Sequence, residues 1–185
     1  MGRVGHVDGV IARPADVVHA PAIARIHWDS WVATYGGVFP QQSFDEFPLA
    51  QRERLWTHEA GLNADASRRS QLLVALQGER VLGFAHVGPY RVQPFDTTES
   101  GADGELRALY LDPALQRRGI GRLLWSAATR QLQAMNFAAL RLWVIDGNHA
   151  AEDFYRAMGA VPVGSTSFDA HGKTLREICY RLAPL

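Results

Sequence analysis

The chain has 185 residues, 47% of them hydrophobic and 21% charged, a composition typical of one globular domain and unlike that of a disordered segment. Lysine plus arginine equal aspartate plus glutamate at 19 each, so no net positive charge favours a nucleic acid partner. The single cysteine, Cys179, excludes an internal disulfide and indicates a packed thiol in a reducing compartment. We expect a single domain over residues 1–185, with its core at about 8–183.

The sequence shows neither a membrane-spanning segment nor a set of metal ligands. No run of residues approaches the roughly 20 apolar positions of a membrane helix, and the first ten residues lack the order of a secretory signal. The 7 histidines show no metal-ligand spacing, so no metal is predicted. These observations predict a cytoplasmic protein without a membrane partner.

Hydrophobic periodicity and turn residues predict the elements of the first half of the chain. In chain order we expect a strand at 10–12, a helix at 16–34, a connector at 40–48, a helix at 49–59, and strands at 71–76 and 81–87. Residues 88–104 contain prolines and several acidic side chains and predict a long loop. Long loops inside a compact domain are often functional, so this one is a candidate lip of a substrate site.

The second half continues the alternation of strands and helices. In chain order we expect a strand at 105–111, a helix at 119–135, a strand at 139–145, a helix capped by Asn148 and ended by Gly159, and strands at 161–168 and 175–182. The helix at 119–135 has the clearest apolar stripe. Interleaved strands and helices predict an α/β or α+β fold around a mixed sheet.

The turn before the helix at 119–135 carries the strongest chemical signal. Gly119 and Gly121 open this helix, where free backbone N–H groups and the positive end of the helix dipole favour phosphate oxygens. The same turn supplies three arginines: Arg117, Arg118 and Arg122. The phosphate loop of nucleoside triphosphatases and the third glycine of a dinucleotide fingerprint are both missing. Taken alone, the two glycines fit a pyrophosphate site and a plain helix entry beside solvated arginines equally well.

Two longer patterns point to a family. Gln116-Arg117-Arg118-Gly119-Ile120-Gly121, after Leu109-Tyr110-Leu111-Asp112-Pro113, resembles the acetyl-CoA signature of the GNAT superfamily of N-acetyltransferases, Gln/Arg-x-x-Gly-x-Gly/Ala after a strand. Residues 148–160 look like the second signature of that superfamily, with Ala160 where phenylalanine is usual. Residues 22–31 are similar to the first helix of many members, so the resemblance spans nearly the whole chain.

The resemblance implies a GNAT fold: a twisted mixed sheet of six to seven strands with helices on both faces. Two central parallel strands, at 105–111 and 139–145, would splay apart and let the pantetheine arm of CoA lie between them. Asn148 and Tyr155 would lie near the thioester sulfur. The other residues implied to bind acetyl-CoA are Leu109, Tyr110 and Leu111 for the pantetheine, and Gln116, Arg117, Arg118, Gly119, Ile120, Gly121 and Arg122 for the pyrophosphate.

The same resemblance implies transfer of the acetyl group of acetyl-CoA to a primary amine of a small molecule or peptide, by direct attack in a ternary complex. Tyr155 would protonate the departing CoA thiolate, and core packing is the other interpretation of an aromatic residue at this helical position. Glu105 lies where some members have a general base. A solvated charge at the strand end, with a water chain as the base, fits Glu105 equally well.

The acceptor pocket is the least determined part of the site. Trp31, Tyr35 and His86 are candidate walls, and core packing of the two aromatic residues and a structural role for the histidine are the alternatives. Acidic residues of the expected lip would attract a cationic amine, and an amino-acid analogue is equally compatible. These acidic residues are Asp96, Glu99 and Asp103.

Other interpretations of the whole chain stay open. One is a non-catalytic module of the same fold that binds acyl-CoA or a protein partner, although the presence of Tyr155 argues against it. Another is an acetyltransferase that acts on protein N-terminal amines. Many relatives pair through sheet edges, so a homodimer is also compatible with the sequence.

Overall fold

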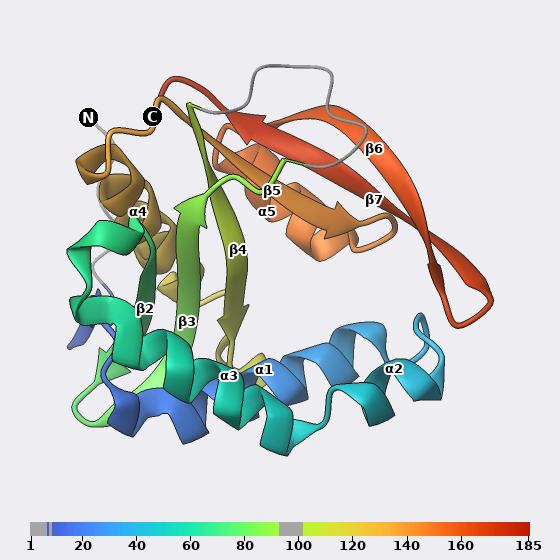
Figure 1. Cartoon of the computed structure of the whole chain (residues 1–185), viewed down its shortest axis with the longest axis horizontal. Coiled ribbons are helices and arrows are strands. Elements are labelled where there is room, and N and C mark those ends of the chain that lie inside the picture. Colours follow the sequence, from blue (N-terminus) through green and yellow to red (C-terminus); the bar gives the residue numbers. More distant parts are fainter. Residues whose placement is uncertain (1–6, 8, 93–101) are drawn as a thin grey trace.

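The computed structural model describes residue 7 and residues 9–92 and 102–185. A seven-stranded sheet in the order β1-β2-β3-β4-β5-β7-β6 forms its centre (Figure 1). The strands are β1 (Val10–Pro14), β2 (Gln71–Gln77), β3 (Arg80–Pro89), β4 (Asp103–Leu111), β5 (Ala139–Ile145), β6 (Val161–Ala170) and β7 (Lys173–Leu182). The α-helices are α1 (Ala20–Tyr35), α2 (Gln41–Glu46), α3 (Leu49–Gly61), α4 (Ile120–Ala134) and α5 (His149–Ala157). The expected mixed sheet with interleaved helices is confirmed.

Helices cover both faces of this sheet (Figure 1). On one face α1 and α3 bury Ile23 and Trp56 against the sheet. On the other face α4 and α5 close a second core around Leu124 and Tyr155. Burial of a large apolar side chain stabilises the fold by about 1.5–3 kcal/mol, so these two cores hold the helices in place. No helix in the described part of the chain combines the length and apolar character that crossing a bilayer requires.

The central strands β4 and β5 are the one parallel pair among the described strands, and the other neighbours are antiparallel. Their pairing covers three residue pairs, which join residues 103–105 to residues 139–141. Beyond these pairs β4 runs on to Leu111 and β5 to Ile145, and the two strands diverge (Figure 1). The splayed central strands implied by the family resemblance are therefore present.

Two expectations about connecting segments are wrong. The connector at 40–48 contains the short helix α2, because Phe44 is buried with its ring 6.2 Å from that of Trp28 and 5.9 Å from that of Trp31. The long loop is shorter than expected at both ends, since β3 extends to Pro89 and β4 begins at Asp103. In both cases contacts with distant segments extend regular structure beyond what the local sequence indicates.

Asp103 does not belong to an exposed acidic lip. Its side chain is buried, and its Oδ2 accepts hydrogen bonds from Arg141 Nε at 2.7 Å and Arg181 Nε at 3.0 Å. Burial alone would raise the pKa of the Asp103 carboxyl, but the hydrogen bonds and charges of the two arginines hold it below its ordinary value. This ion triplet ties β4, β5 and β7 together at the closed end of the gap. Asp96 and Glu99 lie outside the described residues.

The ion triplet predicts a stability change. Asp103→Asn removes the charge that compensates Arg141, so we expect the free energy of unfolding at pH 7 to fall by about 3 kcal/mol. A carboxyl with a lowered folded-state pKa stabilises the fold above its unfolded pKa, and this stabilisation is lost as pH falls through the folded-state value. Urea unfolding should therefore show the difference between wild type and variant shrinking below pH 3.8, the ordinary aspartate pKa.

Asp146→Asn serves as the matched control because its ion pair with Arg176 is largely exposed, and it should change stability by under about 0.5 kcal/mol. An Asp103→Asn protein as stable as this control would contradict the proposed importance of the triplet.

Candidate active site

The turn between β4 and α4 has the backbone of an anion-binding site. Gly119 is the N-cap of α4 and has a φ of 86°, in the left-handed region that glycine tolerates best. No side chain caps the helix. The first N–H groups of a helix have no intrahelical partner, so those at the start of α4 are available to a ligand. Ile120 is buried and anchors the turn to the core.

Gly121 has a packing role that the sequence did not reveal. A Cβ at this position would lie 3.4 Å from Phe154 Cε2 on α5. A methyl group would thus be in van der Waals contact with this ring, and a longer side chain would have to displace it. The left-handed backbone explains the glycine at position 119, and the nearby ring on α5 limits the size of the residue at position 121.

Three arginines surround this turn. Arg117, Arg118 and Arg122 are all exposed, and none of them forms an ion pair with another residue of the described ranges. Gln116 precedes them and is exposed as well. The structure thus brings these predicted residues together, and their charge adds to that of the helix N-terminus.

The gap between β4 and β5 is bridged by contacts between helices on opposite faces of the sheet. Asn148 caps α5, where its Oδ1 accepts a hydrogen bond from Ala151 N at 3.2 Å. Its Nδ2 donates to the Tyr35 hydroxyl, at the end of α1, at 2.9 Å. Since α1 and α5 cover different faces, this hydrogen bond crosses from one face of the sheet to the other, at the place where the central strands have separated. Two predicted site residues therefore meet in the gap.

Tyr155 lies on the helix that Asn148 caps. Its ring packs 5.6 Å from that of Trp125 on α4, on the same face as α5. Burial raises the pKa of its hydroxyl, and the charges of Tyr110 and Tyr35 would raise it further. Within the described residues this hydroxyl has no hydrogen-bond partner. A neutral phenol with an unused proton thus lies near two tyrosines that belong to the opposite face.

Tyr110 occupies the α1 side of β4. Its hydroxyl accepts a hydrogen bond from Trp31 Nε1 at 3.1 Å, and burial raises its pKa to about 12. One backbone group beside it already has a partner, because the Leu111 carbonyl accepts a hydrogen bond from Ser30 Oγ at 2.7 Å. Leu109 points to the α4 side and packs against that core. Along residues 106–111, β4 pairs with β3 on one side only, so backbone groups that face the gap can bind a ligand.

Glu105 is at the last residue pair before the strands diverge. It is 3% exposed. Arg91 donates two hydrogen bonds to its carboxylate, from Nε to Oε2 at 2.9 Å and from Nη2 to Oε1 at 2.7 Å. The backbone N–H of Arg91 makes a further bond to Oε2 at 3.1 Å. A carboxylate has about four lone-pair positions, so one position on Oε1 is left for a further donor. Glu105 is an anchored carboxylate and not a solvated charge at a strand end.

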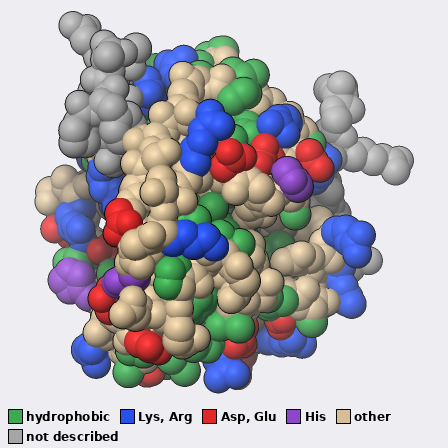
Figure 2. Space-filling model, turned by 90° about the vertical axis from the view of Figure 1, so that its right-hand side faces the viewer, with side chains coloured by type: hydrophobic (Ala, Val, Ile, Leu, Met, Phe, Trp, Pro, Cys, Tyr) green, Lys and Arg blue, Asp and Glu red, His purple; other side chains and the backbone are tan. Residues whose placement is uncertain are grey.

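The aromatic group predicted as a pocket wall or as core consists of Trp28, Trp31, Tyr35 and Phe39. The ring of Trp31 lies 5.3 Å from that of Tyr35 and 5.1 Å from that of Phe39. The β6–β7 hairpin closes on it, since Lys173 Nζ donates to the Val38 carbonyl at 2.6 Å. On the face that carries α2 and this hairpin, hydrophobic side chains line a hollow among interspersed acidic and basic ones (Figure 2).

His86 is separate from this group. It is buried beneath α3, where its Nε2 lies 3.0 Å from Ser70 Oγ and 3.4 Å from Glu59 Oε2. Burial, followed by the charge of Arg107, lowers its pKa to about 3. The histidine is therefore a neutral packing residue in this structure, and the structure does not bring it together with Trp31 and Tyr35.

Arg52 is a candidate functional residue that the sequence analysis missed. It lies on the buried face of α3 with Trp56 and Ala60, at a spacing of four residues. This position was the available signal, because a charged residue in an apolar helical stripe is unusual. Its guanidinium lies 4.9 Å from the ring of Trp31.

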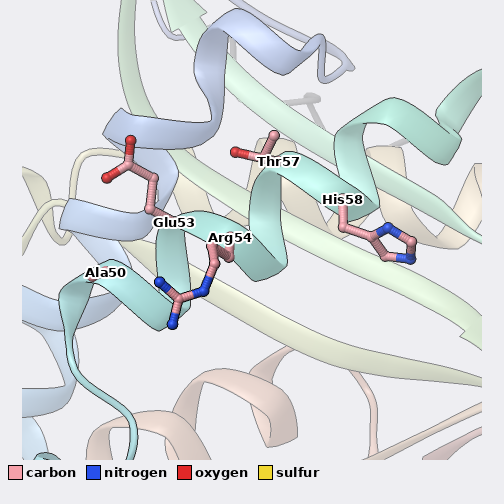
Figure 3. A pocket seen from close by; sticks show the side chains of 5 residues that line it. All are labelled: Ala50, Glu53, Arg54, Thr57 and His58. Carbon is pink, nitrogen blue, oxygen red and sulfur yellow. The ribbon is translucent and has the colours of Figure 1, made fainter.

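A second concave region lies away from this site. A shallow depression on the outer surface of α3 is lined by residues of that helix alone, and their side chains point in different directions (Figure 3). These residues are Ala50, Glu53, Arg54, Thr57 and His58. Among the residues whose placement is described, no three acidic, histidine or cysteine side chains form a group able to hold a metal ion.

Comparisons with known proteins agree with this geometry. The model of the acetyltransferase (GNAT) family matches residues 21–160. The uncharacterized N-acetyltransferase YuaI of Bacillus subtilis (strain 168) is 31% identical over 171 residues, which is 91% of this chain and 90% of that protein.

Two solved structures have the same fold. The PaiA N-acetyltransferase of Thermoplasma acidophilum, in complex with coenzyme A, has a TM-score of 0.75 and 16% identity over 95% of this chain and 99% of its own. The yncA protein of Salmonella typhimurium, solved with acetyl-CoA, has a TM-score of 0.72 and 18% identity over 95% and 94%. Taken with the family match and the Bacillus relative, the divergent strands and the turn at Gly119 lead to one conclusion: this chain belongs to the acetyltransferase (GNAT) family and is an acyltransferase.

Proposed function

We propose that the protein transfers the acetyl group of acetyl-CoA to a primary amine of a small molecule or peptide. The observation that carries this proposal is the hydrogen bond between Asn148 and Tyr35 across the gap between β4 and β5, with Tyr155 buried on the helix that Asn148 caps. A gap of this kind admits an extended arm from one side and an acceptor from the other. Support also comes from the relatives solved with coenzyme A and acetyl-CoA.

Acetyl-CoA would bind along the α4 side of the gap. The N–H groups at the start of α4, with Arg117, Arg118 and Arg122, would hold the pyrophosphate. Backbone groups of residues 109–111 that face the gap would bind the pantetheine amides. The thioester would then lie near the Tyr155 hydroxyl, between the two faces of the sheet.

Acetyl transfer would proceed by direct attack of the amine on the thioester carbonyl. The C–N bond forms as the C–S bond breaks, and the CoA sulfur leaves with the electron pair. Tyr155, whose phenol is protonated at neutral pH, would give its proton to this sulfur as negative charge develops there. No acetylated enzyme forms in this scheme, and Cys179 is buried away from solvent.

The amine must lose a proton because an alkylamine is mostly ammonium at neutral pH, with a pKa near 10. We assign the acceptance of this proton to Glu105 through the open position on Oε1. Arg91 donates to both oxygens of the carboxylate and fixes its orientation, so the open position on Oε1 has a defined direction. Trp31 and Tyr35 would form the wall against which the acceptor packs.

Charge reversal at the helix entry tests the pyrophosphate site. Arg122→Glu should weaken acetyl-CoA binding in calorimetry about tenfold to hundredfold, as expected for loss of a charge-assisted contact of about 1.5–3 kcal/mol. Arg130→Glu makes the same charge change on an exposed position of the same helix and should leave the dissociation constant within about twofold. Equal effects of both variants would show that only overall charge matters.

Removal of the Tyr155 hydroxyl tests the proton donor. Tyr155→Phe keeps the ring against Trp125 and should leave acetyl-CoA affinity unchanged while kcat falls about a hundredfold, a typical contribution of a general acid. Thiol release across a panel of amines measures kcat, and intersecting initial-rate patterns would support the ternary complex. Full activity of the variant would assign the tyrosine to packing.

Glu105→Gln should lower kcat with little change in acetyl-CoA affinity. The deficit should shrink as pH rises toward the pKa of the acceptor amine, because more of the amine then arrives neutral. Rates from pH 7 to 10 measure this, with Glu79→Gln in the exposed β2–β3 turn as control. A deficit that stays constant with pH would assign the base to water and Glu105 to positioning.

A further inference from the structure

Among the residues that the structure describes, Arg52 is a buried cation without an anionic partner. Its side chain has an exposure of 0%, and its Nε donates to the Phe47 carbonyl at 3.0 Å. Its two terminal nitrogens, Nη1 and Nη2, are buried and make no hydrogen bond within the described part of the chain. No acidic side chain of that part forms an ion pair with it. A buried charge in this state is strongly destabilising unless something compensates it.

The surroundings compensate the charge only in part. The guanidinium carbon lies 4.5 Å from the ring of Phe47, 4.9 Å from that of Trp31 and 5.5 Å from that of Trp28. Such cation–π contacts attract the charge but leave its N–H donors unpaired. Burial lowers the pKa of Arg52 to about 10, with the neighbouring Tyr110 opposing the shift, so the group stays charged at neutral pH.

The titratable groups that face Arg52 supply no negative charge. His27 of α1 has its pKa lowered to about 3 by burial and by the charge of Arg52 itself, so it is neutral. Its Nδ1 accepts a hydrogen bond from Trp56 Nε1 at 3.1 Å. Tyr110 is a protonated phenol at neutral pH. The protein thus maintains a positive charge in an aromatic surrounding with neutral neighbours.

The unpaired nitrogens have a specific geometry. Nη1 and Nη2 form one edge of the planar guanidinium, and together they can donate two parallel hydrogen bonds to the two oxygens of a carboxylate. The Nε–H, which would serve the other edge, is already used by the Phe47 carbonyl. The open edge therefore suits a planar two-oxygen anion.

Arg52 is also adjacent to the proposed acceptor wall. Trp31 packs on the guanidinium with its ring and donates from Nε1 to the Tyr110 hydroxyl, which lies on the α1 side of the gap. Trp28, Trp31 and Phe47 are each only half-buried. The guanidinium thus lies one layer of aromatic side chains below the surface, and a ligand would reach it only if one of these rings moved.

We propose that Arg52 binds a carboxylate of the acceptor, so that the substrate is an amino acid or a related molecule with both an amine and a carboxylate. This inference rests on the proposed function and narrows its substrate class. Arg52 would hold the carboxylate on the α1–α3 side while the amine reaches the gap at Tyr35 and Tyr155. Amines that lack the carboxylate would leave the guanidinium unpaired and bind more weakly.

Binding of product analogues tests the proposal without requiring turnover. Wild-type protein saturated with CoA is titrated with matched N-acetyl compounds, such as N-acetyl-phenylalanine and N-acetyl-phenethylamine or N-acetyl-leucine and N-acetyl-isoamylamine. Calorimetry and the fluorescence of the tryptophans on Arg52 report binding. We expect at least one carboxylate compound to bind tenfold or more tightly than its partner. Equal or absent binding of both members in every pair would overturn the proposal.

Substitution then assigns the preference to Arg52. Arg52→Lys keeps the charge but loses the planar edge, and it should weaken the carboxylate ligand at least tenfold while changing the carboxylate-free ligand less than twofold. Arg54→Lys, two residues away on the exposed side of α3, should change neither. A preference that survives Arg52→Lys would assign the carboxylate to another group, and an Arg52→Lys protein that does not fold leaves the wild-type comparison decisive.

Two further readouts separate this inference from the proposed function. Inorganic phosphate, added as a tetrahedral oxyanion, should compete poorly with the carboxylate ligand, and tighter binding of phosphate would overturn the assignment of a carboxylate. Acetylation of amines and amino acids with equal efficiency would leave the N-acetyltransferase proposal intact and remove the role of Arg52. Absence of acetyl-CoA binding would instead remove the proposed function.

Discussion

β4 and β5 share three residue pairs and then diverge, and the contacts between the two faces of the sheet pass through the gap that results. Asn148 belongs to the helix on one face and Tyr35 to the helix on the other, yet their side chains form a hydrogen bond of 2.9 Å. In a continuous sheet the strand backbones would separate these helices by the full thickness of the layer. The opening of the sheet is therefore the condition for a site that uses side chains from both faces.

The closed end of the gap is held by ionic contacts. Asp103 forms ion pairs with Arg141 and Arg181. Glu105, two residues further along β4, forms an ion pair with Arg91. Isolated buried ion pairs add little stability, but they specify which groups can lie together, since a charge left without its partner is strongly unfavourable. We infer that these pairs define where the strands stop pairing. The same arrangement leaves one acceptor position of Glu105 directed away from Arg91.

Local patterns in the sequence were sufficient for most of the order of strands and helices and for the glycine turn that opens α4, because apolar periodicity and glycine positions express both directly. Long-range contacts account for what was missed. Helix α2 depends on the packing of Phe44 against α1, and the burial of Asp103 depends on Arg181, which is 78 residues away. Arg52 was missed because its position in an apolar stripe was the only local signal, and its aromatic surroundings come from α1 and from the end of α2.

The two halves of the site differ in the kind of group that forms them. On the α4 side the proposed ligand-binding groups are backbone amides and exposed arginines, so recognition there would depend on the path of the chain more than on individual side chains. On the α1–α3 side they are buried side chains, with Trp31 and Arg52 in contact. Substitutions on that side can alter which acceptor fits without disturbing the sheet or the turn. In the proposed site, specificity for the acceptor would thus be structurally separable from the binding of the acetyl donor.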